Sequence, residues 1–461
     1  MKASSLLVAA LATGSLAASA GAHQRKPRVV HLDTYKNPSD PVRDHLRRRK
    51  RDTLEAPLEN LDTLYFINAS VGNPPQDLHL HLDTGSSDMW VNTADSELCS
   101  LPEDPCEAGG TYDQGASSTA KDAGSGFNIS YADGSGAAGG YVTDTFRLGS
   151  VSIDDFQFGV GDESSSPRGI LGIGYANNEV QVLRDGEDPY DNLPLRLASE
   201  GHIQSAAYSI YLNDLDARRG SILFGGVDAE RYEGDLETLP VESEGGDFTR
   251  LLVTLTKLEF GGETVQDDMA LAVLLDSGSS ISYLPGDVVS PLYEAAGASF
   301  SQEAGLAFVP CSARDDSKSV DFTFTSPTIS VPMDELVLDL SSGSGRGGVE
   351  LPDGEDACVF GIAPAGEGTS VLGDTFMRSA YVVFDLENNE ISIAQTRLNS
   401  SKSDVREIKA GKDGVPGAKK VEDPVQATTG LQDDGESVGA GAACSLAGTA
   451  AVALLATLAV W

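Results

Sequence analysis

The apolar residues of this chain fall mostly into short runs that end in turn-forming residues. Residues 78–83 (LHLHLD) alternate apolar and polar positions and lead into a turn of small residues. A period of two is typical of a strand with one buried face. Segments with helical periodicity are scarce, and 50 Gly and 21 Pro interrupt the chain. The pattern predicts a mainly β fold rich in turns, and 461 residues are enough for two lobes.

The N-terminal region has the pattern of a secreted, processed protein. Residues 1–20 have a basic start, an apolar stretch and a small-residue end, which predicts a cleavable signal peptide. Residues 21–51 are basic and end in RRRKR. After a signal peptide, this is typical of a pro-segment that a processing protease cuts at Lys50-Arg51. A solvated charge run or a nucleic-acid patch is the alternative.

The C-terminal region predicts a tether. Residues 398–441 are polar and lack apolar periodicity, which predicts a flexible linker. Residues 442–461 contain an apolar tail that is shorter than the ~20 residues of a typical spanning helix and has no basic flank. With small residues upstream, the tail predicts a GPI-anchor signal. A simple transmembrane tail is the alternative.

Charge and cysteines narrow the function classes. The formal net charge is −38, and the chain after Arg51 is more acidic still. Such a surface repels nucleic acid and favours an acidic working environment. Of the five cysteines, Cys444 belongs to the tail. The other four allow three connectivities, of which nearest-neighbour pairing is expected, namely Cys99 with Cys106 and Cys311 with Cys358. No Cys or His pairs have zinc spacing, so we predict no metal and no other cofactor.

An internal repeat carries the candidate chemistry. DTGSS at 83–87 and DSGSS at 276–280 each follow an apolar strand, and each has an apolar-apolar-Gly segment downstream, at 169–174 and 370–374. A single Asp-Thr-Gly is usually an ordinary β-turn. Two copies instead predict two pseudo-symmetric lobes facing each other, residues 52–245 and 246–397, whose axis brings Asp83 and Asp276 together.

With Trp90 and the hairpin ISYADGS at 129–135, these motifs give a family resemblance. Over about residues 60–397 the chain resembles the pepsin-like aspartic peptidases, and with its two ends added it is most similar to the GPI-anchored fungal yapsin-type members. The resemblance implies a bilobal β fold with a cleft between the lobes. It also implies peptide or protein substrates, and hydrolysis by a water that Asp83 and Asp276 activate, without a covalent intermediate.

The chemistry of such a pair explains its small neighbours. Two carboxylates about 3 Å apart cannot both stay ionised, as is established for aspartic proteases in general, so one acts as acid and the other as base. Glycine lets backbone N–H groups approach a carboxylate closely. By resemblance, two hydroxyls tie the loops together and two more bond the outer carboxylate oxygens. The expected supporting residues are Thr84, Gly85, Ser86, Ser277, Gly278 and Ser279.

The hairpin around Tyr131 is implied to be a flap over the cleft. Two β-type runs flank Ala-Asp-Gly-Ser, which is a hairpin signal. By resemblance, Tyr131 hydrogen-bonds towards Trp90, and groups near Asp133 and Gly134 hold the peptide. An ordinary surface hairpin is the alternative. His79 and His81 share the strand face of Asp83, and we expect packed or rim positions for them.

These observations predict a secreted, monomeric, surface-anchored aspartic endopeptidase that works at acidic pH. Its location would be the outer face of the plasma membrane or the cell wall. A catalytically silent binding protein of the same fold is the alternative. Three Asn-x-Ser sequons are candidate N-glycosylation sites, namely Asn68, Asn128 and Asn399.

Overall fold

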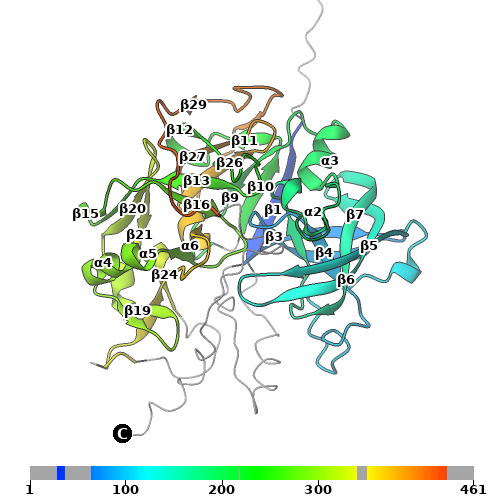
Figure 1. Cartoon of the computed structure of the whole chain (residues 1–461), viewed down its shortest axis with the longest axis horizontal. Coiled ribbons are helices and arrows are strands. Elements are labelled where there is room, and N and C mark those ends of the chain that lie inside the picture. Colours follow the sequence, from blue (N-terminus) through cyan, green and yellow to red (C-terminus); the bar gives the residue numbers. More distant parts are fainter. Residues whose placement is uncertain (1–27, 37–63, 218, 340–349, 353, 433–461) are drawn as a thin grey trace, which may run out of the picture.

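Two lobes built mainly of β-strands lie side by side, one coloured blue to cyan and the other green to orange (Figure 1). The computed structural model describes residues 28–36, 64–217, 219–339, 350–352 and 354–432. The predicted signal peptide, the dibasic site and the anchor signal lie outside the described residues. The predicted mainly β, bilobal fold is confirmed.

One sheet joins the two halves of the chain. Among the described residues it has fourteen strands, with β26 and β27 from the second half placed next to β9 and β12 from the first. In spatial order the strands are β29 (Ala418–Lys420), β12 (Tyr232–Pro240), β27 (Glu390–Thr396), β26 (Ala380–Asp385), β9 (Ala207–Tyr211), β10 (Arg219–Phe224), β1 (Val30–Lys36), β2 (Tyr65–Val71), β3 (Gln76–Asp83), β8 (Ile170–Gly172), β4 (Met89–Asn92), β7 (Val151–Ser164), β6 (Gly136–Leu148) and β5 (Lys121–Ser130).

Smaller sheets build the second lobe. One contains β13 (Leu252–Leu255), β16 (Leu271–Leu275), β25 (Val371–Leu372), β17 (Ser282–Leu284) and β24 (Ile362–Pro364). A second contains β15 (Glu263–Gln266), β14 (Lys257–Phe260), β20 (Ser319–Thr323) and β21 (Thr328–Pro332). A third contains β18 (Ser299–Ser301), β19 (Leu306–Pro310), β23 (Ala357–Phe360) and β22 (Val337–Leu338). A separate two-stranded sheet pairs β11 (Gly226–Asp228) with β28 (Val405–Glu407).

Short helices connect the strands and cover their edges. The α-helices are α2 (Val180–Asp185), α3 (Leu193–Ser199), α4 (Gly286–Ala296), α5 (Met333–Leu336) and α6 (Asp374–Met377). The 3-10 helices are η2 (Gln114–Ala116), η3 (Ala176–Asn178) and η4 (Cys311–Asp315). No helix in the described ranges has the length and apolar character that crossing a membrane requires.

Strand β3 shows how the hydrophobic pattern produces the core. Leu78, Leu80 and Leu82 are buried on one face. On the other face His81 is also buried, with its ring 5.6 Å from that of Phe66, while His79 is half-buried. Burial lowers the pKa of both imidazoles. Both histidines therefore have packed positions, as expected from the sequence.

Part of the predicted pro-segment is a strand inside the large sheet. β1 pairs antiparallel with β10 along Val30–Tyr35, and its last residues pair with β2. Thr34 is buried there. The basic composition of residues 21–51 gave no sign of this strand.

The segment 398–432, called here the C-terminal strap, is packed against the fold. β28 pairs antiparallel with β11, and β29 pairs in parallel with β12. Ile408 and Val415 are buried in an apolar cluster that includes Val227. The prediction of a flexible linker over 398–441 therefore needs correction as far as residue 432, because a few apolar residues and backbone pairing fix this polar segment.

Two disulfides link neighbouring cysteines. Cys99 bonds Cys106, and Cys311 bonds Cys358. The expected pairing is confirmed. The second bond closes a 47-residue separation and ties η4 to β23, which the chain-entropy model values at roughly 4 kcal/mol.

Candidate active site

Each aspartate of the repeat follows a buried strand in the middle of a sheet. β3 ends at Asp83, and β16 ends one residue before Asp276. β3 pairs in parallel with β8, and β16 pairs in parallel with β25. A Cβ on Gly172 would lie 2.7 Å from the loop after Asp83, and one on Gly373 would lie 2.3 Å from the loop after Asp276. The apolar-apolar-Gly segments therefore support the two aspartate loops.

The two carboxylates occupy one site. A Cβ on Gly85 would lie 2.5 Å from Asp276 Oδ1, and a Cβ on Gly278 would lie 2.5 Å from Asp83 Oδ1. Real side chains do not tolerate such separations, so each loop approaches the opposite carboxylate through a glycine. The sequence prediction that Asp83 and Asp276 meet agrees with this geometry.

Four buried hydrogen bonds tie the loops across the axis. Thr84 Oγ1 donates to the Leu275 carbonyl at 2.8 Å, and Ser277 Oγ donates to the Leu82 carbonyl at 2.9 Å. Each hydroxyl oxygen also accepts the backbone N–H of the other residue, at 2.9 Å for Thr84 and 3.2 Å for Ser277. The near two-fold network holds the carboxylates at a fixed separation.

Donors to the two carboxylates differ. The N–H of Gly85 donates to Asp83 Oδ1 at 2.8 Å, and the N–H of Gly278 donates to Asp276 Oδ1 at 2.8 Å. The Ser86 hydroxyl donates to Asp83 Oδ2. Among the described residues no matching bond joins the Ser279 hydroxyl to Asp276. That expectation is corrected, because Ser279 lines the cleft and its hydroxyl is not forced to pair within the protein.

The environment favours a proton on Asp276. Burial, and next the charge of Asp83, raise the pKa of Asp276 well above its usual range. The Ser86 hydroxyl donates to Asp83 Oδ2, and among the described residues no hydroxyl donates to Asp276. The pair can therefore present a carboxylic acid at Asp276 and a carboxylate at Asp83.

The β5–β6 hairpin covers the pair. The Tyr131 N–H donates to the Ser135 carbonyl at 2.8 Å, and Gly134 has the positive φ of 81° that its turn requires. The Trp90 indole N–H donates to the Tyr131 hydroxyl at 2.8 Å. The Asp133 Oδ1 accepts the Ser135 N–H, whereas its buried Oδ2 has no partner in the described part of the chain. The hairpin, Trp90 and the aspartates thus lie together, as the sequence predicts.

The cleft between hairpin and carboxylates draws on both lobes. Its lining comes from both aspartate loops, the hairpin, η3, α2 and two segments of the second lobe. These residues are Asp83, Gly85, Ser86, Ile129, Tyr131, Ala132, Asp133, Asn178, Val180, Arg250, Leu274, Asp276, Gly278, Ser279, Thr369 and Val371. An extended peptide can meet apolar, neutral and charged groups along this cleft.

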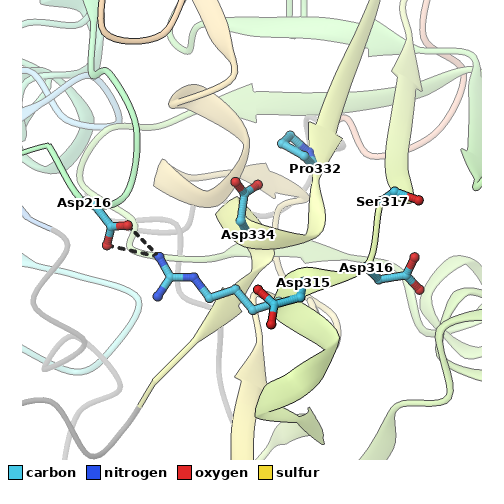
Figure 2. A pocket seen from close by; sticks show the side chains of 7 residues that line it. Asp216, Asp315, Asp316, Ser317, Pro332 and Asp334 are labelled. Carbon is cyan, nitrogen blue, oxygen red and sulfur yellow. Dashed lines mark hydrogen bonds and ion pairs between the residues drawn. The ribbon is translucent and has the colours of Figure 1, made fainter.

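A second hollow of about 480 Å³ lies away from the carboxylate pair (Figure 2). It is lined mainly by acidic residues, and Arg314 pairs there with Asp216 at 3.0 Å. It lacks the buried pair of carboxyl groups that the cleft contains. Among the described residues no group of three or more His, Cys, Asp or Glu side chains is placed to hold a metal ion.

A buried polar network behind the first aspartate loop was missed from sequence. Asp88 accepts hydrogen bonds from the hydroxyls of Tyr141 and Tyr190 and from the N–H of Val180 at 2.8 Å. Glu179 is fully buried and accepts the Tyr190 N–H at 2.9 Å. Burial raises the pKa of Asp88, and burial with nearby Asp88 raises the pKa of Glu179 to about 10.

One signal for this network was present in the sequence. The sixth residue of the first motif is Asp88, while the second motif has Ile281 there. Because Val180 lines the cleft and donates to Asp88, the network supports the wall of the site. The distant partners Tyr141, Tyr190 and Glu179 carried no local signal.

The three candidate glycosylation positions are exposed. Asn68 lies on β2 and Asn128 on β5, close to the hairpin tip. The Asn399 side-chain amide donates to the Asp214 carboxylate. A glycan on Asn399 would replace this contact.

Comparisons with known proteins agree with the geometry. A profile of the eukaryotic aspartyl protease family matches residues 64–396. The chain is 49% identical over 428 residues to a probable aspartic-type endopeptidase opsB of Aspergillus oryzae, covering 91% of this chain and 87% of the relative. It is 35% identical over 370 residues to aspartic proteinase yapsin-3 of Saccharomyces cerevisiae, covering 77% and 70%.

The fold also matches a solved structure. The aspartic proteinase from Irpex lacteus superposes with a TM-score of 0.61 at 20% identity, covering 82% of this chain and all of that one. At this identity the likeness speaks for the fold alone. The profile match over most of the chain, with the two relatives, shows that the chain belongs to the eukaryotic aspartyl protease family.

Proposed function

We propose that this aspartic-type endopeptidase hydrolyses peptide bonds through Asp83 and Asp276, works best at acidic pH and is displayed at the cell surface. The observation that carries the catalytic part is the shared site of the two carboxylates, where each loop's glycine abuts the opposite Asp. The family membership and the fungal relatives support the enzyme class.

The proposed mechanism is general acid–base catalysis by the pair. Charged Asp83 takes a proton from a water held between the carboxylates, while protonated Asp276 gives its proton to the scissile carbonyl oxygen. The water oxygen bonds the carbonyl carbon and forms a tetrahedral diol. Return of a proton to the nitrogen breaks the C–N bond and yields an amine and an acid. No bond to the enzyme forms.

The hairpin would close over an extended peptide. The Trp90 indole N–H holds the Tyr131 hydroxyl, and both Tyr131 and Asp133 line the cleft. Backbone groups of the hairpin would pair with the peptide as an added strand does. Closure would exclude water other than the reacting one.

Acidic operation follows from the need for one proton on the pair. As pH rises through the raised pKa of Asp276, the acid is lost and activity falls. A formal charge of −38 supports the same conclusion, since protonation relieves surface repulsion at low pH.

Secretion, processing and anchoring are proposed from the two ends of the chain. Signal removal after Ala20, cleavage at Lys50-Arg51 and replacement of the apolar tail by a glycolipid would give a mature, monomeric surface enzyme. The test is the N-terminal sequence of the mature protein and its release from cells by phosphatidylinositol-specific phospholipase C. A mature N-terminus far from Asp52, or no release, would contradict this part.

The catalytic test uses the mature protein and a mixed peptide library between pH 3 and 7, with and without pepstatin. We expect acid-favoured cleavage that pepstatin abolishes and that is absent from Asp83→Asn. Cleavage that survives both would place the chemistry elsewhere. A folded, processed protein that binds peptides without cutting them would establish the alternative, a silent surface binding protein.

A further inference from the structure

The C-terminal strap lies beyond the segment that matches the family profile. That match ends at residue 396, and the strap begins at residue 398. Figure 1 shows the strap in orange to red, running past β11 and β12. Ser403 and the N–H of Asp404 bond the buried Asp228 carboxylate, at 2.8 and 2.7 Å. The strap is therefore held by specific contacts as well as by strand pairing.

The end of the strap lies beside the strand that leads to Asp276. The N–H of Ala272 in β16 donates to the Thr429 carbonyl at 2.8 Å, and the N–H of Thr428 donates to the Ala270 carbonyl at 2.8 Å. Gly430 follows with φ of 79°, and a Cβ there would lie 2.7 Å from the Ala272 carbonyl oxygen. This close approach requires a glycine at 430.

From β16 the strap reaches a wall of the cleft. The N–H of Gln432 donates to Glu244 Oε1 at 2.9 Å. Glu244 in turn accepts two N–H bonds from Arg250, one of them from Nε at 2.7 Å. A third guanidinium N–H of Arg250 donates to Thr369 Oγ1 at 2.5 Å. Arg250 and Thr369 both line the cleft.

Charge compensation gives this chain of contacts a chemical consequence. Arg250 is only 7% exposed, so its charge needs a partner at that position. Glu244 supplies a bidentate one. The cleft wall at Arg250 is thus electrically neutral, and Leu274 and Val371, which line the same cleft, are apolar.

We propose that the strap positions this wall of the cleft. The Gln432 amide and the docking of residues 428–430 on β16 hold Glu244, and Glu244 holds and neutralises Arg250. The subsite next to Arg250 therefore accepts neutral and apolar substrate side chains. It repels acidic side chains less than an unpaired carboxylate would, and it does not attract them. The inference rests on the proposed peptidase function. It makes Glu244 and the strap positioning elements rather than catalytic ones.

The test compares two glycine variants in the full chain. Gly430→Ala meets the Ala272 carbonyl, whereas Gly411→Ala lies in the same strap with φ of 86° and open space around its Cβ. Both substitutions place an alanine at a strained positive φ, so the two variants differ only in the contact of the new Cβ with β16. We expect Gly430→Ala to speed hydrogen exchange at the Ala272 amide at least tenfold relative to Gly411→Ala.

The same variants are then assayed on peptides that differ in one side chain, neutral or acidic, at each position around the cut. Glu244→Gln leaves Arg250 without its counter-charge, so we expect the acidic-to-neutral ratio of kcat/KM to rise about fivefold at one position, through KM. Gly430→Ala should shift the ratio at the same position by about threefold with kcat nearly unchanged. Glu230→Gln, which removes a carboxylate from a surface pair with Arg397, is the charge control.

Each outcome decides the proposal. Faster exchange in Gly430→Ala with an unchanged ratio would mean that the strap only stabilises the fold, and the positioning role would be rejected. An equal shift in Glu230→Gln would assign the effect to overall charge and reject it as well. If wild-type protein cuts no peptide, the proposed function fails together with the subsite role, while the exchange measurement still decides whether the strap docks on β16.

Discussion

The two aspartate loops, residues 83–88 and 276–281, share a sequence motif and have different surroundings. Both present a carboxylate at the end of a buried strand, and both accept an N–H from the glycine two residues on, at 2.8 Å. Only the first loop adds a hydroxyl donor, from Ser86. Matching residues thus build the pair, while the hydrogen bonds that reach the two carboxylates differ.

The difference continues behind the loops. The first loop places Asp88 among tyrosine hydroxyls and the Val180 N–H. The second places Ile281, 1% exposed, in an apolar cluster with Leu306 and Val359. One lobe supports its loop with a polar network and the other with hydrophobic packing. A duplicated motif therefore does not imply a duplicated environment.

The largest effect is expected from removing either member of the pair. Asp83→Asn and Asp276→Asn should each lower kcat/KM by about 10³-fold or more, because one loses the base and the other the acid. Asp216→Asn, in the acidic hollow of Figure 2, should leave it unchanged. Kinetics on one peptide with matched melting temperatures check this. Near-normal activity in either variant would remove that residue from the mechanism.

Exchanging the supports should destabilise the fold. Ile281→Asp buries a carboxylate among apolar side chains that cannot donate hydrogen bonds to it. We therefore expect a loss of about 3–5 kcal/mol in the free energy of unfolding. The control Ile281→Val should lose only about 1 kcal/mol. Urea denaturation measures both. If Ile281→Asp were as stable as Ile281→Val, the second loop would tolerate the polar support of the first.

Glu179 should make the first lobe sensitive to alkaline pH. Its pKa is raised to about 10 by burial and by Asp88. The folded state therefore binds the proton more tightly than the unfolded state, and stability is lost as pH rises from about 4.5 towards 10. Glu179→Gln, an isostere of the protonated acid, should gain about 3 kcal/mol at pH 8 and little at pH 4.

Glu187→Gln, which makes the same substitution at an exposed surface position, serves as its control. Melting temperatures at pH 4, 6 and 8 give the comparison. If Glu179→Gln raised the melting temperature equally at all three pH values, the added stability would not come from the protonation of Glu179.

The smallest effect tests the asymmetry of the donors. Ser86→Ala removes the hydroxyl that donates to Asp83 Oδ2, so kcat/KM should fall about tenfold because the carboxyl group is less firmly oriented. Ser279→Ala, at the matching position, should stay within about twofold. The pH profiles of kcat/KM for the two variants, measured side by side, test this difference between the two serines. Equal effects would mean that both loops use their serines alike.

Much of this site was accessible from the sequence. The repeat predicted the two carboxylates and the glycines, because close approach demands glycine wherever two such loops meet. The roles of the Thr84 and Ser277 hydroxyls came from the family resemblance. The flap hairpin and the disulfide pairing were also local signals. The predicted hydrogen bond from Ser279 to Asp276 was wrong, because the likeness between the two motifs does not determine which groups lie opposite each side chain.

Tertiary structure alone decided the rest. Asp88, Tyr190 and Glu179 form a network only because α2 packs behind the first loop, and the polar strap is ordered only because β12, β11 and β16 offer it backbone partners. The sequence by itself determined the chemistry of the site, because the two repeated motifs combine residue types and a spacing that few other structures require. Burial, counter-charges and strand partners come from distant segments, so proton position and cleft-wall charge could be read only from the folded chain.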